Sequence, residues 1–178
     1  MSFAVQLYFD QKSDTAIRTL WEAIASAGVP FPVRDSGNRP HFSLAIYKEL
    51  NVPACTDLLN SFAKTLSPFT LAISNLGVFS EYKTVVFLAP VVIPGLLDLH
   101  RHVHNLLQDA ASLPASHYLP GQWTPHCTLA TRVPPQFLSQ VIEIGIGIAF
   151  PFTLFIEEIG IIQYPPVTHL FSCPLTGT

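Results

Sequence analysis

The strongest constraint on the fold of this chain is a repeat within its own sequence. Segment 40–45 (PHFSLA) recurs as segment 125–130 (PHCTLA), with four identical positions and one Ser/Thr exchange. Further along, segment 68–71 (PFTL) recurs letter for letter as segment 151–154, and a glycine follows nine residues after each of these prolines. Self-similarity of this kind indicates two copies of one supersecondary unit. The repeat therefore predicts two equivalent halves that pack about a pseudo-twofold axis.

Hydrophobic periodicity gives the two halves the same order of elements. Helices are predicted after Ser13 as an N-cap, around Leu58 and Leu66, from Pro94 to Ala110, and from Pro135 onward. Strands are predicted over residues 3–9, 41–47, 69–78, 84–92, 126–133, 152–162 and 169–174, with a polar turn at 80–83 and a loop over 113–125. Each half thus comprises strand, helix and hairpin. We expect one two-lobed α+β domain spanning residues 1–178, with the internal duplication carried by segments 40–45 and 125–130.

The composition excludes several classes of protein and partner. A chain of 178 residues with 49% hydrophobic and 12% charged residues can bury a sizeable core, which excludes disorder. Lys and Arg total 9 against 12 Asp and Glu, and none follows Arg132, so we expect no broad cationic face for a long nucleic acid. The apolar stretch 141–162 is interrupted by Pro151 and three glutamates, which predicts a turn and a buried strand and no membrane span.

Cysteine usage and the first residues indicate a compartment. Cys55, Cys127 and Cys173 are odd in number and unclustered, which favours small buried thiols in a reducing environment over a disulfide framework. Residues 1–10 contain no basic flank followed by an apolar run, so a secretory signal is not expected. The expectation is a cytoplasmic protein.

The repeated segments carry residues suited to phosphate chemistry. Side chains on a strand alternate between faces, so His41 and Ser43 share one face, as do His126 and Thr128. An imidazole transfers protons near neutral pH, and a hydroxyl donates to a phosphate oxygen. If the two strands face each other, one imidazole deprotonates an attacking water while the other protonates the departing oxygen. This arrangement needs no metal and no covalent intermediate.

A structural role for the same residues is the alternative. Both histidines would then lie in the core of a duplicated fold, with their ring nitrogens satisfied by the neighbouring hydroxyl. A single His-x-Ser/Thr pattern is weak evidence, but two of the seven histidines share it together with a preceding proline and a following Leu-Ala. The shared context favours a common functional role.

Two His-x-Ser/Thr-hydrophobic motifs 85 residues apart (126 − 41) resemble those of the 2H phosphoesterase superfamily, which includes 2′-5′ RNA ligase-like and cyclic phosphodiesterase proteins. The resemblance covers nearly the whole chain. It implies two lobes, each an antiparallel sheet with helices outside, around a central cleft. It also implies His41, Ser43, His126 and Thr128 as the site. Members open 2′,3′-cyclic phosphates or ADP-ribose cyclic phosphates, trim RNA ends, or join and cut 2′-5′ linkages. Ser43 stands where many members have Thr.

A cluster of histidines offers a different chemistry. His100 and His104 have the i, i+4 spacing of a zinc pair on the helix that begins at Pro94. No Glu lies between them and no third ligand is evident, so we expect solvated helix residues and no metal. His117 and His169 have no motif context and are left out of the predicted site.

Other residues near the motifs are candidates for substrate contact. Arg39 and Arg132 lie at even offsets from His41 and His126 and would share the face of these rings on regular strands. Aromatic faces stack on any base, and three aromatic residues lie in loops that can border the cleft: Tyr118, Trp123 and Tyr164.

The sequence therefore predicts a metal-independent phosphoesterase that hydrolyses a small cyclic phosphodiester without a cofactor. His126 is assigned as general base and His41 as general acid, and the expected partner is a nucleotide or ribose cyclic phosphate, or an RNA end, bound by a monomer. Two alternatives stay open: a nucleotide-binding module of the same fold that does not turn its ligand over, and a 2′-5′ RNA ligase or nuclease.

Overall fold

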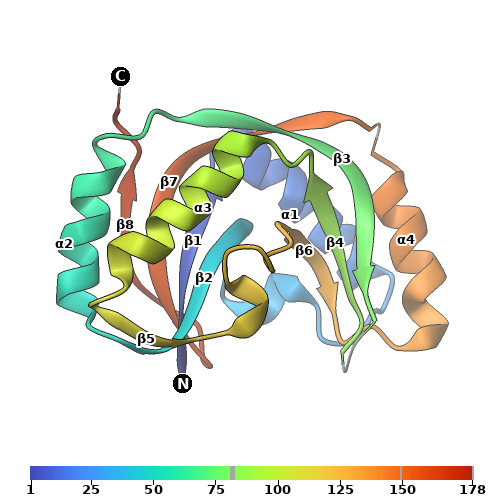
Figure 1. The fold of residues 1–178 in the computed structure, drawn as a ribbon. Coiled ribbons are helices and arrows are strands. Elements are labelled where there is room, and N and C mark those ends of the chain that lie inside the picture. Colours follow the sequence, from blue (N-terminus) through green and yellow to red (C-terminus); the bar gives the residue numbers. More distant parts are fainter. Residues whose placement is uncertain (81–82, 149, 178) are drawn as a thin grey trace.

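The structure is a computed structural model, and it describes residues 1–80, 83–148 and 150–177. These residues form eight strands in one antiparallel sheet and four α-helices, with the strand order β5-β2-β1-β7-β3-β4-β6 and with β8 paired to β7 (Figure 1). The α+β class and the antiparallel sheet predicted from the sequence are confirmed. The polar turn predicted at 80–83 lies partly outside the described residues.

The strands are β1 (Ser2–Phe9), β2 (His41–Leu50), β3 (Phe69–Phe79), β4 (Val85–Pro90), β5 (Ala111–Pro114), β6 (Cys127–Thr131), β7 (Phe152–Tyr164) and β8 (Thr168–Pro174). The α-helices are α1 (Gln11–Ser26), α2 (Val52–Ala63), α3 (Pro94–Leu107) and α4 (Leu138–Ile146). Short 3₁₀ helices occupy Val33–Ser36, Ser116–Tyr118 and Pro135–Phe137. Strand β5 was not predicted. It is only four residues long, and its last two residues lie in the loop that was expected over 113–125.

Strand β7 joins the two halves of the sheet. Its first residues pair with β3, and its later residues pair with β1. Within the β3–β7 pair, Leu71 lies directly opposite Leu154, the equivalent residue of the repeat. Pairing between equivalent positions places a local twofold axis at these two leucines. On one side of this point lie β1, β2, β5 and β8, and on the other lie β4 and β6.

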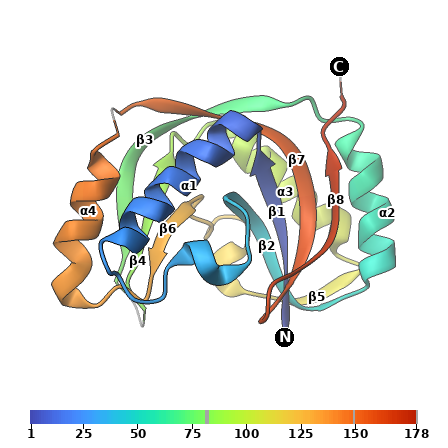
Figure 2. The same ribbon diagram turned by 180° about the vertical axis from the view of Figure 1, so that it is seen from behind.

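The helices cover the outer surface, and two of them contact the half of the sheet opposite to the strand that they follow. Helix α1 contacts β1, which precedes it, and also packs against β6 and α4, whereas α3 follows β4 but packs against β2 and α2. Figure 2 shows α1 and α4 beside β4 and β6 from behind. No helix in the described part of the chain is long and apolar enough to span a membrane.

Helix boundaries differ in places from the sequence prediction. The N-cap of α1 is Asp10, whose carboxylate accepts a hydrogen bond from the Ser13 amide (2.9 Å), and the Ser13 hydroxyl instead accepts one from the Phe155 amide (3.0 Å). Helix α2 ends at Ala63, before Leu66. The apolar residues of α1 are buried, as expected for a core-facing helix: Ile17, Leu20, Trp21 and Ile24.

Each motif strand contains a β-bulge at the same point of the repeat. On β2, Ser43 pairs with Gln6 and Ala45 with Val5, which leaves Leu44 without a partner. On β6, Thr128 pairs with Phe87 and Ala130 with Val86, which leaves Leu129 without one. A bulge inserts one residue and reverses the alternation of faces beyond it.

Candidate active site

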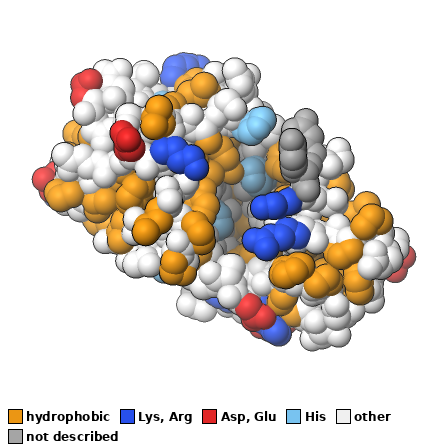
Figure 3. All heavy atoms as spheres, turned by 90° about the horizontal axis from the view of Figure 1, so that it is seen from below, with side chains coloured by type: hydrophobic (Ala, Val, Ile, Leu, Met, Phe, Trp, Pro, Cys, Tyr) orange, Lys and Arg blue, Asp and Glu red, His pale blue; other side chains and the backbone are white. Residues whose placement is uncertain are grey.

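The two motifs lie on opposite walls of a cleft between the halves of the sheet. Seen from below in Figure 3, this face is hollowed, with histidine side chains in the hollow and Lys and Arg side chains beside it. The cleft has two chambers, of about 520 Å³ and about 650 Å³. His41 and Ser43 line the first chamber and His126 lines the second. The structure thus brings the two predicted histidines to one cleft.

Three residues line both chambers and form the boundary between them: Tyr118, Thr128 and Thr131. Burial raises the pKa of the Tyr118 hydroxyl, Tyr164 adds to this rise, and a hydrogen bond with the Ser43 side chain opposes it. The Tyr118 ring also lies 6.2 Å from the ring of His126. Tyr118 therefore bridges the first motif and the second.

Both catalytic candidates are oriented in the same way. Nδ1 of His41 lies 2.6 Å from the carbonyl oxygen of Arg39, and Nδ1 of His126 lies 2.7 Å from that of Thr124. A carbonyl oxygen can only accept, so each Nδ1 carries a proton and donates it. In the neutral ring this leaves the lone pair on Nε2, the nitrogen that can take up or give away a catalytic proton.

Burial controls the titration of both rings. It lowers the pKa of His41 to about 4, the hydrogen bond to Arg39 opposes this shift, and the charge of His126 adds to it. Burial also lowers the pKa of His126, against the opposing hydrogen bond to Thr124. Both rings are therefore neutral at pH 7 in the protein alone. An anion between them favours the charged form of each.

Of the two arginines predicted to contact substrate, Arg132 lines the cleft and Arg39 does not. Arg39 does not line either chamber, because its guanidinium forms a bidentate ion pair with Glu158 (2.8 and 3.0 Å) and lies 4.1 Å from the ring centroid of Tyr8. The structure therefore does not bring Arg39 into the cleft with the two predicted histidines. Its neighbours come from β1 and β7, which the sequence could not bring together.

Arg132 lines the first chamber, but not for the reason given by its even offset from His126. The bulge at Leu129 reverses the alternation, so Thr131 is the strand residue that faces the cleft. Arg132 follows the end of β6 with a left-handed backbone (φ 54°), and its guanidinium lies 5.3 Å from the ring centroid of Phe31. It reaches the chamber from outside the strand.

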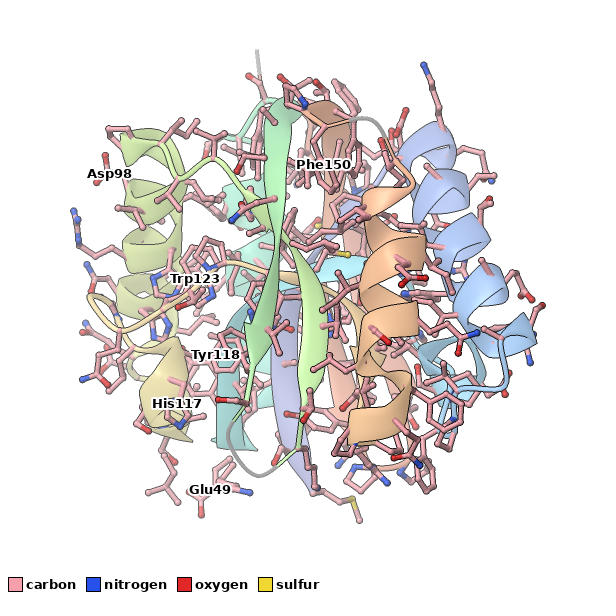
Figure 4. The ribbon with its side chains drawn as sticks, turned by 90° about the vertical axis from the view of Figure 1, so that its right-hand side faces the viewer. Glu49, Asp98, His117, Tyr118, Trp123 and Phe150 are labelled. Carbon is pink, nitrogen blue, oxygen red and sulfur yellow. The ribbon has the colours of Figure 1, made fainter. Side chains whose placement is uncertain are left out.

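The structure places two of the three predicted aromatic residues in the lining of the cleft. Tyr118 and Tyr164 line the cleft, whereas Trp123 is buried and lines neither chamber. The Trp123 ring stacks on His100, with centroids 4.1 Å apart, and its indole N–H donates to the carbonyl of Ser43 (3.1 Å). Figure 4 shows Trp123 and Tyr118 between α3 and the sheet. Trp123 therefore lies behind the site.

Of the histidines on α3, His100 is a buried structural residue, whereas His102 is exposed. The prediction that they are solvated is wrong for His100, which is 2% exposed and whose Nε2 donates to the carbonyl of Tyr118 (2.9 Å). Burial lowers its pKa to about 4, with a smaller contribution from His104. Across residues 1–80, 83–148 and 150–177, no group of three His, Cys, Asp or Glu side chains is placed to hold a metal ion.

Several cleft residues have no signal in the sequence. Gln6 enters the first chamber because it pairs with Ser43 across β1 and β2, and its side-chain oxygen accepts a hydrogen bond from the Tyr8 hydroxyl (3.0 Å). His117, which lacked motif context, lines the second chamber with Lys83 and Phe79. Strand pairing places Gln6 beside the first motif, whereas His117 lies in the 3₁₀ helix Ser116–Tyr118 and Lys83 lies just before β4.

The prediction of three buried cysteines is confirmed, since all three are free and buried.

A family model described as the 2′-5′ RNA ligase superfamily matches residues 9–165. No curated protein sequence matches the chain significantly.

Solved structures of similar fold cover nearly the whole chain. TT0787 of Thermus thermophilus is 20% identical, with a TM-score of 0.62 and 99% of each chain covered. LigT of E. coli, complexed with 3′-AMP, is 19% identical, with a TM-score of 0.58 and 99% of each chain covered. Usb1 of Kluyveromyces marxianus is 11% identical, with a TM-score of 0.55, 98% of this chain and 97% of that chain covered. At these identities the likeness establishes the fold.

Proposed function

Because the chain belongs to the 2′-5′ RNA ligase superfamily, as its matched residues 9–165 show, we propose that it hydrolyses a small cyclic phosphodiester with two histidines and no metal. One observation carries the proposal: His41 and His126 each donate from Nδ1 to a backbone carbonyl, and each lines a chamber of the same cleft. Family membership supports a phosphoesterase or ligase-like role.

The proposed reaction is a single displacement at phosphorus. Nε2 of His126 takes a proton from water as the water oxygen bonds to phosphorus. The bond from phosphorus to the ribose oxygen breaks, and Nε2–H of His41 protonates that oxygen. Thr128 and Ser43 donate hydroxyl hydrogen bonds to the non-bridging oxygens as their negative charge grows. The two rings end with exchanged protonation states, which solvent restores.

The substrate we propose is a nucleotide or related ribose carrying a cyclic phosphate, or an RNA end. The related structures were determined with 3′-AMP in LigT and uridine monophosphate in Usb1, which supports a nucleotide for this chain as well. Tyr118 and Tyr164 offer aromatic faces in the cleft for a base or ribose. We further propose that the enzyme acts as a cytoplasmic monomer without a cofactor.

A second candidate function is cleavage or joining of a 2′-5′ linkage between two nucleosides. It is favoured by the two chambers, which lie on either side of Tyr118 and Thr128 and each exceed about 300 Å³, the lower size for a ligand pocket. In either case the phosphorus lies between the two histidines, where the chambers meet; a cyclic nucleotide then places its one nucleoside in a single chamber, whereas a dinucleotide places one nucleoside in each.

We also propose that the two halves arose by internal duplication of one domain. The direct pairing of Leu71 with Leu154 and the matching bulges at Leu44 and Leu129 support this proposal.

The test is a substrate screen with product identification. Purified protein is incubated with 2′,3′-cyclic nucleotides, 2′-5′ dinucleotides and ADP-ribose cyclic phosphates, and products are assigned by mass and ³¹P NMR. Turnover of a cyclic phosphate is expected, and turnover of the dinucleotides alone favours the second candidate. Tight nucleotide binding without turnover of any diester would overturn the proposal in favour of a binding module.

A further inference from the structure

The two tryptophans of the chain make the same contact from unrelated positions. Nε1–H of Trp21, on α1, donates to the carbonyl of Thr128 at 2.9 Å. Nε1–H of Trp123, in the loop before the second motif, donates to the carbonyl of Ser43 at 3.1 Å. In each case the acceptor belongs to the residue that carries the motif hydroxyl.

Both acceptor residues lie beside a β-bulge, where the ladder of backbone hydrogen bonds is interrupted. Ser43 and Thr128 immediately precede Leu44 and Leu129, the residues left without a partner by the two bulges. A bulge disrupts the ladder of backbone hydrogen bonds, and buried backbone groups then require other partners. The indole N–H groups supply these partners and fix the backbone at the point where the hydroxyl side chain leaves it.

Trp123 is itself held by further contacts. Its ring stacks on His100 with the two planes 4° apart. His100 donates to the Tyr118 carbonyl (2.9 Å), and Tyr118 lines the first chamber together with Ser43. Contacts thus run from Ser43 through Trp123 and His100 to Tyr118, and Figure 4 shows the Trp123 and Tyr118 side chains beside α3.

Trp21 is held by the core. It is 2% exposed on the buried face of α1, the helix that packs on the half of the sheet containing β6. Its indole reaches 107 residues along the chain to Thr128. The two indole N–H groups therefore donate to equivalent backbone carbonyl oxygens of the two motifs.

We propose that Trp21 and Trp123 are positioning residues. Their indole N–H groups hold the backbone of Thr128 and Ser43 so that both hydroxyls donate hydrogen bonds to the oxygens of one phosphate group. The part of the proposal that concerns turnover rests on the proposed phosphoesterase function. The part that concerns phosphate binding does not. Neither indole touches the substrate, because neither lines the chambers.

The test replaces the N–H and keeps the shape of the ring. Each tryptophan is exchanged singly for 3-benzothienylalanine, in which sulfur replaces the indole N–H, and Trp123→Phe serves as a second variant. Ile24→Val, on the same buried face of α1 as Trp21, is the matched control for loss of packing alone. Measurements are kcat and KM on the best diester, the Kd of inorganic phosphate by NMR titration, and Tm.

In each benzothienyl variant kcat is expected to fall about tenfold, equivalent to about 1.4 kcal/mol, with a smaller change in KM. The Kd of inorganic phosphate is expected to rise about fivefold, from the loss of one ordered hydroxyl. Ile24→Val should lower Tm and leave kcat and phosphate affinity unchanged. The proposal would be overturned if the benzothienyl variants had a lowered Tm but kept wild-type kcat and phosphate affinity. The indoles would then contribute only packing. If wild-type protein turns over no diester, the proposed function fails, and the phosphate titration still decides the role of the indoles.

Discussion

The pH dependence of kcat/KM follows directly from the burial of the two histidines. Acid-base catalysis needs one ring neutral and the other charged in the free enzyme. A free histidine has a pKa of about 6.5, but burial lowers the pKa of His41 to about 4 and lowers that of His126 as well. The profile is therefore a bell whose maximum lies between the two lowered values, below pH 6.5, whichever ring is the acid.

The size of the effect can be worked out from His41. At pH 7, three pH units above a pKa of about 4, roughly one His41 ring in 1000 is charged. On the alkaline limb kcat/KM should thus fall about tenfold per pH unit. A bound phosphate favours the charged form of both rings, so the maximum of kcat should lie at higher pH than that of kcat/KM. The two rings interact, so the limbs belong to the pair.

The assay is a steady-state profile from pH 4 to 9 on the best substrate, with circular dichroism at each pH to verify folding. The residual rate of His126→Gln should give a kcat/KM profile with only one of the two limbs of the bell. A flat kcat/KM profile from pH 5 to 9, or a maximum above pH 7, with chemistry shown to limit the rate, would refute the two-histidine mechanism.

Three other predictions concern the catalytic rings, metal dependence and packing. His41→Ala or His126→Ala should each lower kcat by about 10² to 10⁴ with unchanged circular dichroism, and near-normal kcat in either variant contradicts the mechanism. Exhaustive chelation should leave activity unchanged, whereas loss with chelator and recovery with zinc or manganese rejects a metal-free reaction. Gly77→Ala should destabilise the protein by about 1 to 3 kcal/mol in urea unfolding, because its Cβ clashes with the ring of Phe87. The control Gly95→Ala, in open space on α3, should be neutral or stabilising, and equal losses would argue against the clash.

The sequence was sufficient to predict the motifs, the four α-helices and every described strand except β5. Repeated segments mark equivalent strands, and alternation within a strand correctly placed His41 beside Ser43, because the first residues of each motif precede the bulge. The β3–β4 hairpin and the α-helices were likewise predicted from local periodicity. These features depend on residues close together in the chain.

The remaining features depend on pairing between distant segments. The bulge at Leu129 is a property of the register between β4 and β6, so an offset counted along one strand could not place Arg132. The partner of Arg39 is Glu158, 119 residues away. Trp123 sits in a loop, where exposure is the usual expectation, yet its contact with His100 buries it.

The continuous sheet has a consequence for the spacing of the two imidazoles. Strands β2, β1, β7, β3, β4 and β6 form one unbroken path between the motifs. Adjacent strands lie about 4.8 Å apart and twist relative to one another. The gap across which a proton donor faces a proton acceptor is thus set by curvature accumulated over six strands. A change of twist where Leu71 meets Leu154, midway along this path, alters that gap without touching either histidine.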